Sequence, residues 1–338
     1  PHTASGYAAF AGINTGFMLV AAILVYMAPR AVGSGLPALK AYLNGVRVPG
    51  LLRVRTLFAK VIGVTLVVST GFPMGREGPM VHAGASLAAI LSRLQIGPLQ
   101  ALVSFGLPSK QRTWVGMGCA AGVAAACSAP LGGILYPAEE ACSHWHAKLT
   151  WRSFFCVVIA AVVFNVIISP TQSEGSPSVL LARGFVIGLD TVASHDYGYA
   201  DLGWFTVVGA SGGLLGAGYN VVVFSLRSLR ERLVRGDARK RVLETVLITW
   251  LASTAYYWLP TAFPCRPCAG GGGSTSLAAA HGAQSLLYMQ HTCERGHYSP
   301  LGTLLMSPQE GIIKRLFSRD ESSADDVPVG ELGTFLAV

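Results

Sequence analysis

Long apolar stretches, separated by short polar segments, cover most of the chain from residue 7 onward. Several of them fall short of the roughly 20 residues that a helix needs to cross a bilayer, or are rich in glycine and proline. We therefore expect broken and re-entrant helices. Irregular backbone at membrane depth must be buried in protein or line a watery cavity, which favours a pore or transporter over an anchored domain. The stretches are approximately 7–29, 56–75, 80–92, 114–136, 153–169, 178–189, 203–226 and 242–263.

Composition supports a membrane protein. Charged residues make up 12% of the 338 and hydrophobic residues 51%, whereas a soluble domain has about 25% charged residues. The mean hydropathy is +0.49. The chain is therefore expected to be integral to a membrane, in contact with the lipid bilayer.

The net charge of +8 is unevenly distributed along the chain. Seven basic residues lie within 227–241, against the two acids Glu231 and Asp237. A short basic segment between spans indicates the cytoplasmic face, and we prefer this to nucleic-acid or specific lipid binding. A sparser basic group, expected on the same side, comprises Lys40, Arg47, Arg53, Arg55 and Lys60.

The cysteines fall into two groups. Cys265, Cys268 and Cys293 lie in a polar loop at about 264–300. This loop is one span away from the cytoplasmic basic segment, so it is expected on the luminal or extracellular side, where a disulfide is the natural state. Free thiols and a zinc site remain alternatives, although no second ligand pair completes the zinc spacing. The other group is expected to be small buried hydrophobes: Cys119, Cys127, Cys142 and Cys156.

Both ends of the chain resemble those of a fragment. It starts at Pro1 with an apolar span already opening at residue 7, and no signal peptide is visible. Gly333–Val338 reads as the start of a further apolar helix. Before it, Ser307-Pro308 with Glu310 predicts a short capped helix.

Two motifs suggest enzymes but lack the necessary context. Gly209–Gly213 fits the G-x-S-x-G nucleophile elbow, yet it lies within an apolar run whose small residues indicate close helix packing. Gly33–Ala38 fits a loose dinucleotide fingerprint, but no βαβ pattern surrounds it and no acidic residue follows at the expected distance. We therefore expect no enzymatic activity.

Two other segments have the pattern of an anion-binding helix start. Gly33-Ser34-Gly35 precedes Pro37, and Gly75–Pro79 precedes a second apolar helix. Glycines allow close backbone approach, and proline suits the first turn of a helix. The unpaired N–H groups and the helix dipole then favour an anion in front of each helix. Ordinary turns at span ends are the alternative for either motif alone.

Three stretches, taken in order, resemble the signature motifs of the CLC family of chloride channels and chloride/proton exchangers. They are "GSGLPALKAYLNGV", "GREGPMVHAGA" and "AAGVAAACSAPLGGILYPAEEACSHW". The likeness extends over almost the whole chain from about residue 10 and is greatest to the eukaryotic intracellular exchangers.

The resemblance implies an all-α multi-pass membrane protein of the CLC inverted-repeat fold, with broken, re-entrant helices. The family's G-x-F-x-P motif, pore tyrosine and CBS domains have no counterpart before Val338, so we expect an incomplete second half. The expected division is a transmembrane region at 1–262, a luminal or extracellular loop at 263–300, and a short helix with the start of a truncated membrane helix at 301–338.

The resemblance also implies residue roles. The Ser34 hydroxyl would bind chloride, and serine rather than proline there implies a preference for chloride over nitrate. Glu77 would be the gating glutamate, because a carboxylate competes with chloride for the same donors until it is protonated. Glu140 would be the internal proton-transfer residue of an exchanger. The remaining chloride-binding positions would be Gly35, Leu36, Arg76 and Gly78.

Two residues depart from the family pattern, and one pair allows another interpretation. Pro137 stands where the family has an ordinary helix former, and a proline there would kink the helix and displace Glu140. Ala38 replaces an acid or amide. Glu139-Glu140 could instead mark the cytoplasmic end of a span.

The function implied is voltage- or pH-linked chloride transport, as chloride/proton antiport. A passive chloride channel and a non-transporting truncated subunit are the alternatives. Chloride and protons would be substrates, with no cofactor, no metal and no nucleic acid. The resemblance further implies a homodimer in the membrane of an intracellular vesicle, lysosome or vacuole rather than the plasma membrane.

Overall fold

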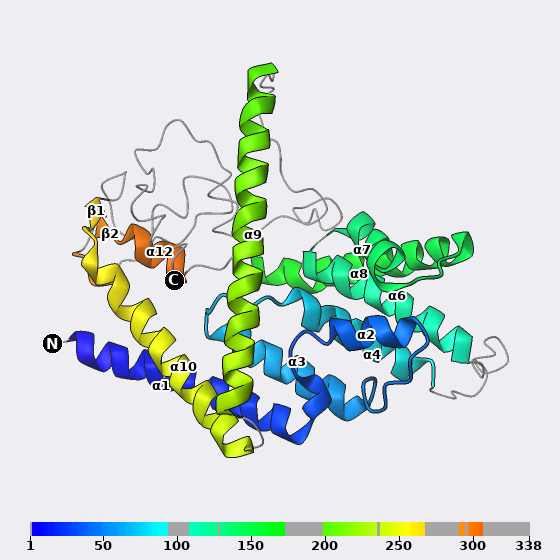
Figure 1. Cartoon of the computed structure of the whole chain (residues 1–338), viewed down its shortest axis with the longest axis horizontal. Coiled ribbons are helices and arrows are strands. Elements are labelled where there is room, and N and C mark those ends of the chain that lie inside the picture. Colours follow the sequence, from blue (N-terminus) through cyan, green and yellow to red (C-terminus); the bar gives the residue numbers. More distant parts are fainter. Residues whose placement is uncertain are drawn as a thin grey trace.

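The computed structural model describes residues 2–93, 108–127, 129–172, 199–234, 237–267, 291–294 and 297–306. Within these ranges the protein consists of helices and one two-stranded sheet, which confirms the predicted all-α class (Figure 1). Three predicted features lie outside the described residues: the apolar stretch 178–189, the helix from Ser307, and the segment Gly333–Val338.

Most predicted apolar stretches form helices. The stretch 114–136 forms two, because the chain turns at Ala129 and restarts with Pro130, a residue suited to the first helical position. The long helices are α1 (His2–Met27), α3 (Val54–Ser69), α4 (Glu77–Leu91), α6 (Pro108–Cys127), α8 (Ala147–Gln172), α9 (Tyr199–Leu233) and α10 (Ala238–Trp258). The short ones are α2 (Leu36–Leu43), α7 (Pro130–Tyr136), α12 (Pro300–Met306) and the 3₁₀ turns Pro29–Ala31 and Leu259–Ala262.

Among the described residues, three helices are long and apolar enough to cross a membrane: Ala4–Met27 in α1, Ala147–Phe164 in α8 and Leu202–Leu233 in α9. In contrast, α2 has 8 residues, α4 has 15 and α7 has 7. These are too short for a hydrocarbon layer of about 30 Å. The expected combination of spanning and broken helices is therefore present.

Glycines let α4 and α6 pack backbone against backbone. A Cβ at Gly122 would lie 2.7 Å from the carbonyl oxygen of Met80 and 2.8 Å from the Cα of Val81. A Cβ at Gly118 would lie 2.6 Å from the Cβ of Ala88. Gly118 and Gly122 are four residues apart, the spacing that brings membrane helices close together.

The core at the centre of the molecule joins α2, α4 and α6. The packing is dense, because small side chains alternate with leucine and valine across facing helices. Its buried members are Leu39, Leu51, Leu52, Val81, Ala85, Ala89, Val115 and Cys119. A second cluster, Ala120, Ala124, Ile134 and Val157, holds α6, α7 and α8 together.

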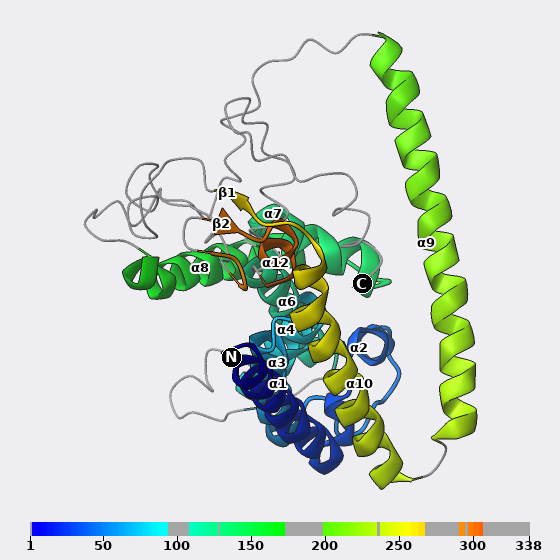
Figure 2. The ribbon, with the colours of Figure 1, turned by 90° about the vertical axis from the view of Figure 1, so that its left-hand side faces the viewer.

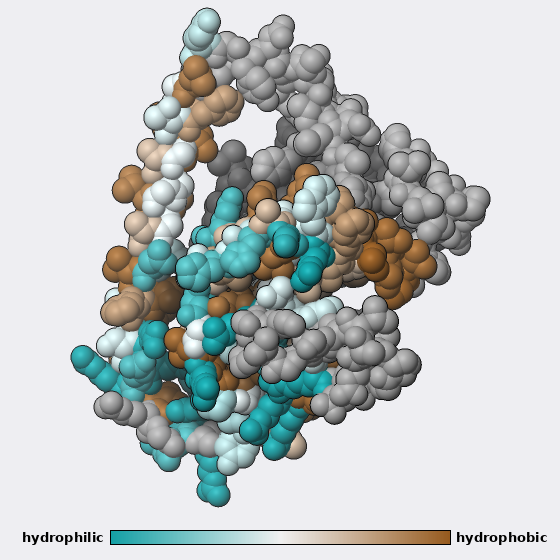
Figure 3. Space-filling view, turned by 90° about the vertical axis from the view of Figure 1, so that its right-hand side faces the viewer, coloured by the Kyte–Doolittle hydropathy of each residue, from teal (hydrophilic) through white to brown (hydrophobic). Residues whose placement is uncertain are grey.

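Helix α9 stands apart from the other helices (Figure 2). None of its candidate spanning window is buried, and its surface is brown and pale for most of its length in Figure 3. The prediction of close packing at 209–218 is not met within the described residues, where a Cβ at Gly209, Gly212 or Gly216 would meet nothing within 4 Å. Helix packing through glycine needs a second helix, and no described element lies against this face.

The basic segment joins α9 to α10. The Arg230 guanidinium Nε lies 2.7 Å from the Glu244 carboxylate across the two helices. The other pairs, Arg227 with Glu231 and Lys240 with Asp237, lie within four residues of each other. Most of these side chains are exposed, as expected of a segment on an aqueous face.

The predicted disulfide forms between Cys265 and Cys293. It lies next to an antiparallel pair, β1 (Arg266–Pro267) with β2 (His297–Tyr298). Cys268 lies outside the described residues. The remaining cysteine prediction holds for Cys119, which is fully buried, but not for Cys127, which is exposed at the end of α6.

Helix α12 was not predicted from sequence, although Ser299-Pro300 offers the signal. The Ser299 hydroxyl accepts a hydrogen bond from the N–H of Gly302 at 3.1 Å, and Pro300 is the first helical residue. A serine N-cap followed by proline at the first helical position is the pattern from which a helix was predicted only at Ser307-Pro308. Leu301 and Leu305 of α12 then pack with Phe72 and Tyr256.

Candidate functional site

The first glycine motif forms the turn that starts α2. Gly33 and Gly35 have φ angles of +61° and +77°, a left-handed conformation that glycine adopts without strain. Pro37 is the second residue of the helix, as predicted. The N–H of Leu36 donates to the Ser34 hydroxyl oxygen at 3.3 Å, so that hydroxyl lies at the helix N-terminus.

The second motif includes the start of α4, whose first residue lies two positions before Pro79. Glu77 is the first residue of the helix and Pro79 lies within its first turn, where a missing N–H breaks no intrahelical bond. No side chain caps this helix start. Its first N–H groups and the helix dipole therefore point out from the beginning of the helix.

The two helix starts meet at Ser34 and Gly78. A Cβ at Gly78 would lie 2.6 Å from the Cβ of Ser34 and 3.5 Å from a methyl of Leu36. Only glycine fits at this distance. Two motifs more than 40 residues apart in sequence are thereby brought to one point, as an anion site built from two helix N-termini requires.

The side chains of Glu77 and Arg76 turn in different directions. The Glu77 carboxylate lies over Gly75, where a Cβ would be 2.9 Å from its Oε2 atom. The Arg76 guanidinium is directed toward the end of α6, with Nη2 3.5 Å from the carbonyl oxygen of Ala126. Glu77 is exposed next to the shared helix starts.

Lys60, a member of the sparser basic group, packs against the turn that carries Ser34. Its side chain is buried in α3, with 3% exposure, and Nζ donates to the carbonyls of Ala31 at 2.8 Å and Gly33 at 2.5 Å. The turn ahead of Ser34 supplies the carbonyl partners that a buried ammonium group needs. Lys60 thus stabilises the turn before Ser34 through hydrogen bonds to its carbonyl groups.

His82 supports the same motif from α4. Its side chain is 1% exposed, and its Nε2 lies 3.2 Å from the carbonyl oxygen of Leu51. The ring occupies the space where a side chain at Gly35 would project. The supporting roles of His82 and Lys60 were not predicted from the sequence. The sequence feature that could have indicated a buried Lys60 is its place as a single lysine inside the apolar stretch 56–75.

Glu140 lies on a π-helical turn, Pro137–Ala141, that follows α7. The regular helix is interrupted at Pro137, which has no N–H to donate to the carbonyl of Gly133. Helix α7 ends at Tyr136, and in the turn that follows the N–H of Cys142 donates to the carbonyl of Pro137, five residues back, at 3.0 Å. The wider turn leaves both Glu139 and Glu140 exposed.

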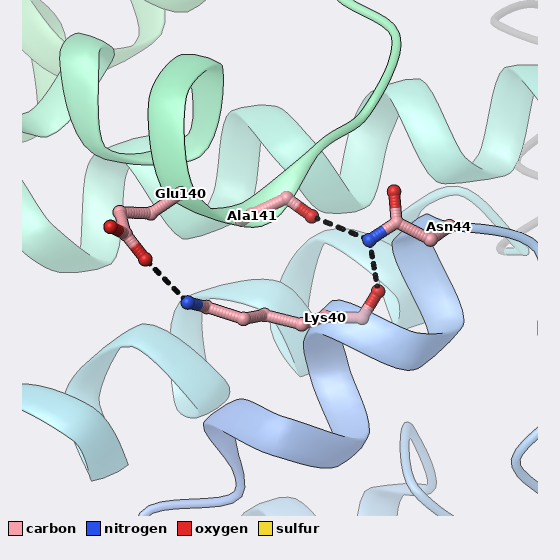
Figure 4. A network of polar contacts seen from close by, with 4 residues as sticks. All are labelled: Lys40, Asn44, Glu140 and Ala141. Carbon is pink, nitrogen blue, oxygen red and sulfur yellow. Dashed lines mark hydrogen bonds and ion pairs between the residues drawn. The ribbon is translucent and has the colours of Figure 1, made fainter.

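Helix α2 reaches this turn through Lys40 and Asn44 (Figure 4). Lys40 Nζ lies 2.5 Å from Glu140 Oε2. Asn44 Nδ2 donates to the Ala141 carbonyl at 3.3 Å. The hydrogen bond and charge of Lys40 lower the pKa of the Glu140 carboxyl below its usual value. The structure thus brings Ser34, Gly35, Leu36 and Gly78 together at one end of α2, while Glu140 meets the other end.

Within the described ranges no three histidine, cysteine or acidic side chains gather as metal ligands. The groups present at the site are N–H and hydroxyl donors, a neighbouring carboxylate, and an ion-paired glutamate. Fold and site together define an α-helical membrane protein whose broken helices start at a shared point suited to an anion.

The comparisons identify the family. The family model described as "Voltage gated chloride channel" matches residues 16–308, and the chain belongs to this family. A solved structure titled "Crystal Structure of a eukaryotic CLC transporter" aligns with a TM-score of 0.59 and 25% sequence identity, covering 76% of this chain and 42% of that one. The predicted family and fold are therefore confirmed.

Curated relatives extend the likeness. "Chloride channel protein CLC-c" of Arabidopsis thaliana is 35% identical over 321 residues, which cover 93% of this chain and 41% of that protein. "H(+)/Cl(-) exchange transporter 7" of Homo sapiens is 32% identical over 328 residues, covering 95% and 39%. The chain spans about two fifths of the length of the relatives it matches.

Proposed function

We propose that this protein moves chloride across a membrane in exchange for protons. The observation that carries the proposal is the contact between Ser34 and Gly78, which joins two helix N-termini at one point. Backbone N–H groups of Gly35, Leu36, Arg76 and Gly78, with the Ser34 hydroxyl, would bind the anion there. Membership of a family with relatives named as chloride channels and H(+)/Cl(-) exchangers supports the choice of ion.

Glu77 would act as the gate. Its ionised carboxylate competes with chloride for the donors at the start of α4, and protonation removes both the negative charge and the competition. One residue would thereby link proton uptake to anion movement. Glu140 would exchange protons with the internal solution, which agrees with its exposed position.

The test is flux from liposomes that contain the purified protein, with chloride and proton movements recorded together. Glu77→Ala should retain chloride flux and lose its dependence on the proton gradient. Glu140→Ala should lower proton flux at least tenfold, a loss of about 1.4 kcal/mol or more in transition-state stabilisation, and leave chloride flux within twofold. Glu139→Ala is the matched control and should keep both fluxes.

Proton flux that is unaffected by Glu140→Ala would rule out this exchange mechanism. In the unaltered protein, a reversal potential that does not depend on the pH gradient would instead favour a passive chloride channel. Some relatives are named as channels. No chloride flux at all would indicate a non-transporting subunit.

The assembly and location proposed are a homodimer in an intracellular vesicle membrane. Both rest on the resemblance to intracellular exchangers. Cross-linking in native membranes followed by mass measurement tests the dimer, and microscopy of a fluorescent fusion tests the location. A monomer, or a signal confined to the plasma membrane, would contradict the respective proposal.

A further inference from the structure

Two side chains of α2 hold the turn that carries Glu140. Lys40 and Asn44 are four residues apart and so project from the same face of the helix. Lys40 contacts the Glu140 carboxylate at 2.5 Å. Asn44 donates to the carbonyl of Ala141 at 3.3 Å, so adjacent residues of the turn are held from two points of α2 (Figure 4).

Asn44 also fixes the chain beyond the turn. Its Oδ1 accepts hydrogen bonds from the N–H of Ser143, at 2.8 Å, and from the Ser143 hydroxyl. Its Nδ2 donates to the carbonyl of Lys40 at 2.9 Å as well. The amide therefore links the end of α2 to both sides of Cys142, where the π turn closes.

The contact with Lys40 affects the direction of the Glu140 carboxylate more than the stability of the fold. The two side chains are 38% and 61% exposed, and an exposed ion pair contributes little to the stability of a fold. The pair does select one direction for a carboxylate that would otherwise sample several rotamers. Proton transfer depends on that direction, since a misplacement of about 1 Å can slow a reaction on the order of a hundredfold.

We propose that Lys40 is a positioning residue for proton transfer, which directs the Glu140 carboxylate while Asn44 fixes the turn beneath it. The inference rests on the proposed function of Glu140. It adds a physical link between the two ion sites, because α2 starts at the Ser34 motif and reaches Lys40 after a helical rise of about 8 Å from Gly35. Movement of the anion motif would be transmitted to Glu140 through one rigid helix.

The transport test compares three substitutions in liposomes. Lys40→Met removes the charge and keeps the length of the side chain, and it should lower proton flux about tenfold while chloride flux stays within twofold. Lys40→Arg restores a cation and should keep at least half of the proton flux. Lys148→Met, near the start of α8, is the matched control and should change neither flux.

A merely structural role for Lys40 predicts a different result. Both fluxes would then fall together in Lys40→Met, and that outcome would overturn the inference, as would an unchanged proton flux. Asn44→Asp adds an independent arm, because it keeps the acceptor for Ser143 and loses the Nδ2 donor to Ala141. It should lower proton flux in the same selective way, and an equal loss of both fluxes would count against the role of Asn44.

A second measurement does not require transport. A carbodiimide modifies protonated carboxyl groups, and mass spectrometry can report the ratio of Glu140 to Glu139 modification in the same peptide. Lys40→Met should raise that ratio several-fold, because an ion-paired carboxylate resists protonation. An unchanged ratio overturns the inference even if Glu140 proves to be a proton carrier. A raised ratio supports the contact even if Glu140→Ala refutes the exchange mechanism.

Discussion

The smallest features that define the site are the left-handed glycines before α2. Gly33 and Gly35 both have positive φ, but their surroundings differ. A Cβ at Gly33 would meet nothing within 4 Å, whereas one at Gly35 would overlap the buried ring of His82. Sequence alone identified the motif through its glycines, serine and proline. It could not rank the two glycines, because His82 lies 47 positions further along the chain.

Alanine substitutions separate these two effects at the residue scale. Gly33→Ala should destabilise the protein by about 1–2 kcal/mol, the strain of a left-handed alanine. Gly35→Ala should carry the same strain and destabilise the protein by about 1–3 kcal/mol more, because the His82 ring must move in a packed interior. Thermal unfolding of the purified variants in detergent measures both. Equal shifts in the two variants would show that His82 does not constrain Gly35.

At the element scale, glycine decides which helices approach closely. The pair Gly118 and Gly122 places α6 against α4, and this contact holds the start of α4 at the Ser34 turn. The run at 209–218 has a similar composition, yet it meets no described element. From composition and spacing we predicted close helix packing only for the run at 209–218, where it is not met within the described residues, and not for Gly118 and Gly122, where it occurs. Composition and spacing could not tell which of the two segments would find a partner.

Leucine substitutions test this difference between the two helices. Gly122→Leu should destabilise the protein by about 1–3 kcal/mol or more, because its side chain would meet the α4 backbone at Met80 and Val81. Gly212→Leu on α9 should leave stability unchanged or raise it slightly, since leucine favours a helix. The midpoints of thermal unfolding report both changes. A large loss in Gly212→Leu would reveal a packing partner for α9.

At the scale of the whole molecule, α9 is the element with the most unusual surroundings. Its 35 residues would extend about 53 Å, well beyond the apolar thickness of a bilayer. Its apolar side chains are exposed along its length, and its basic end is tied to α10 by Arg230 and Glu244. An apolar surface of this extent is stable only against lipid or further protein.

Thiol labelling tests where α9 lies relative to the membrane. Leu214 and Ser228 are both exposed and lie about 21 Å apart along the helix. In a background with the other free cysteines replaced by serine, Leu214→Cys should react at least tenfold more slowly with a charged maleimide than Ser228→Cys. The reason is that the middle of the helix would be shielded by the hydrocarbon layer. Comparable rates in intact membranes would place the middle of α9 in water.

The sequence by itself determined the class of protein, most helices, and the two anion motifs, because hydropathy, glycine and proline act locally on the backbone. It also identified Pro137 as a residue that disturbs a regular helix, and α7 ends just before it. Only the tertiary structure decided the contacts among distant residues. For example, the partners of Lys60, the carbonyls of Ala31 and Gly33, could not be predicted from its place in a basic group.

The same division applies to Lys40 and Glu140, which are 100 residues apart and meet only because α2 packs beside the π turn. The meeting of Ser34 with Gly78 likewise depends on how α2 and α4 cross. Residue type fixes what a side chain can bind, whereas the fold fixes which partner comes within reach. The motifs could therefore be recognised in the sequence, whereas the distant residues that contact and stabilise them could not.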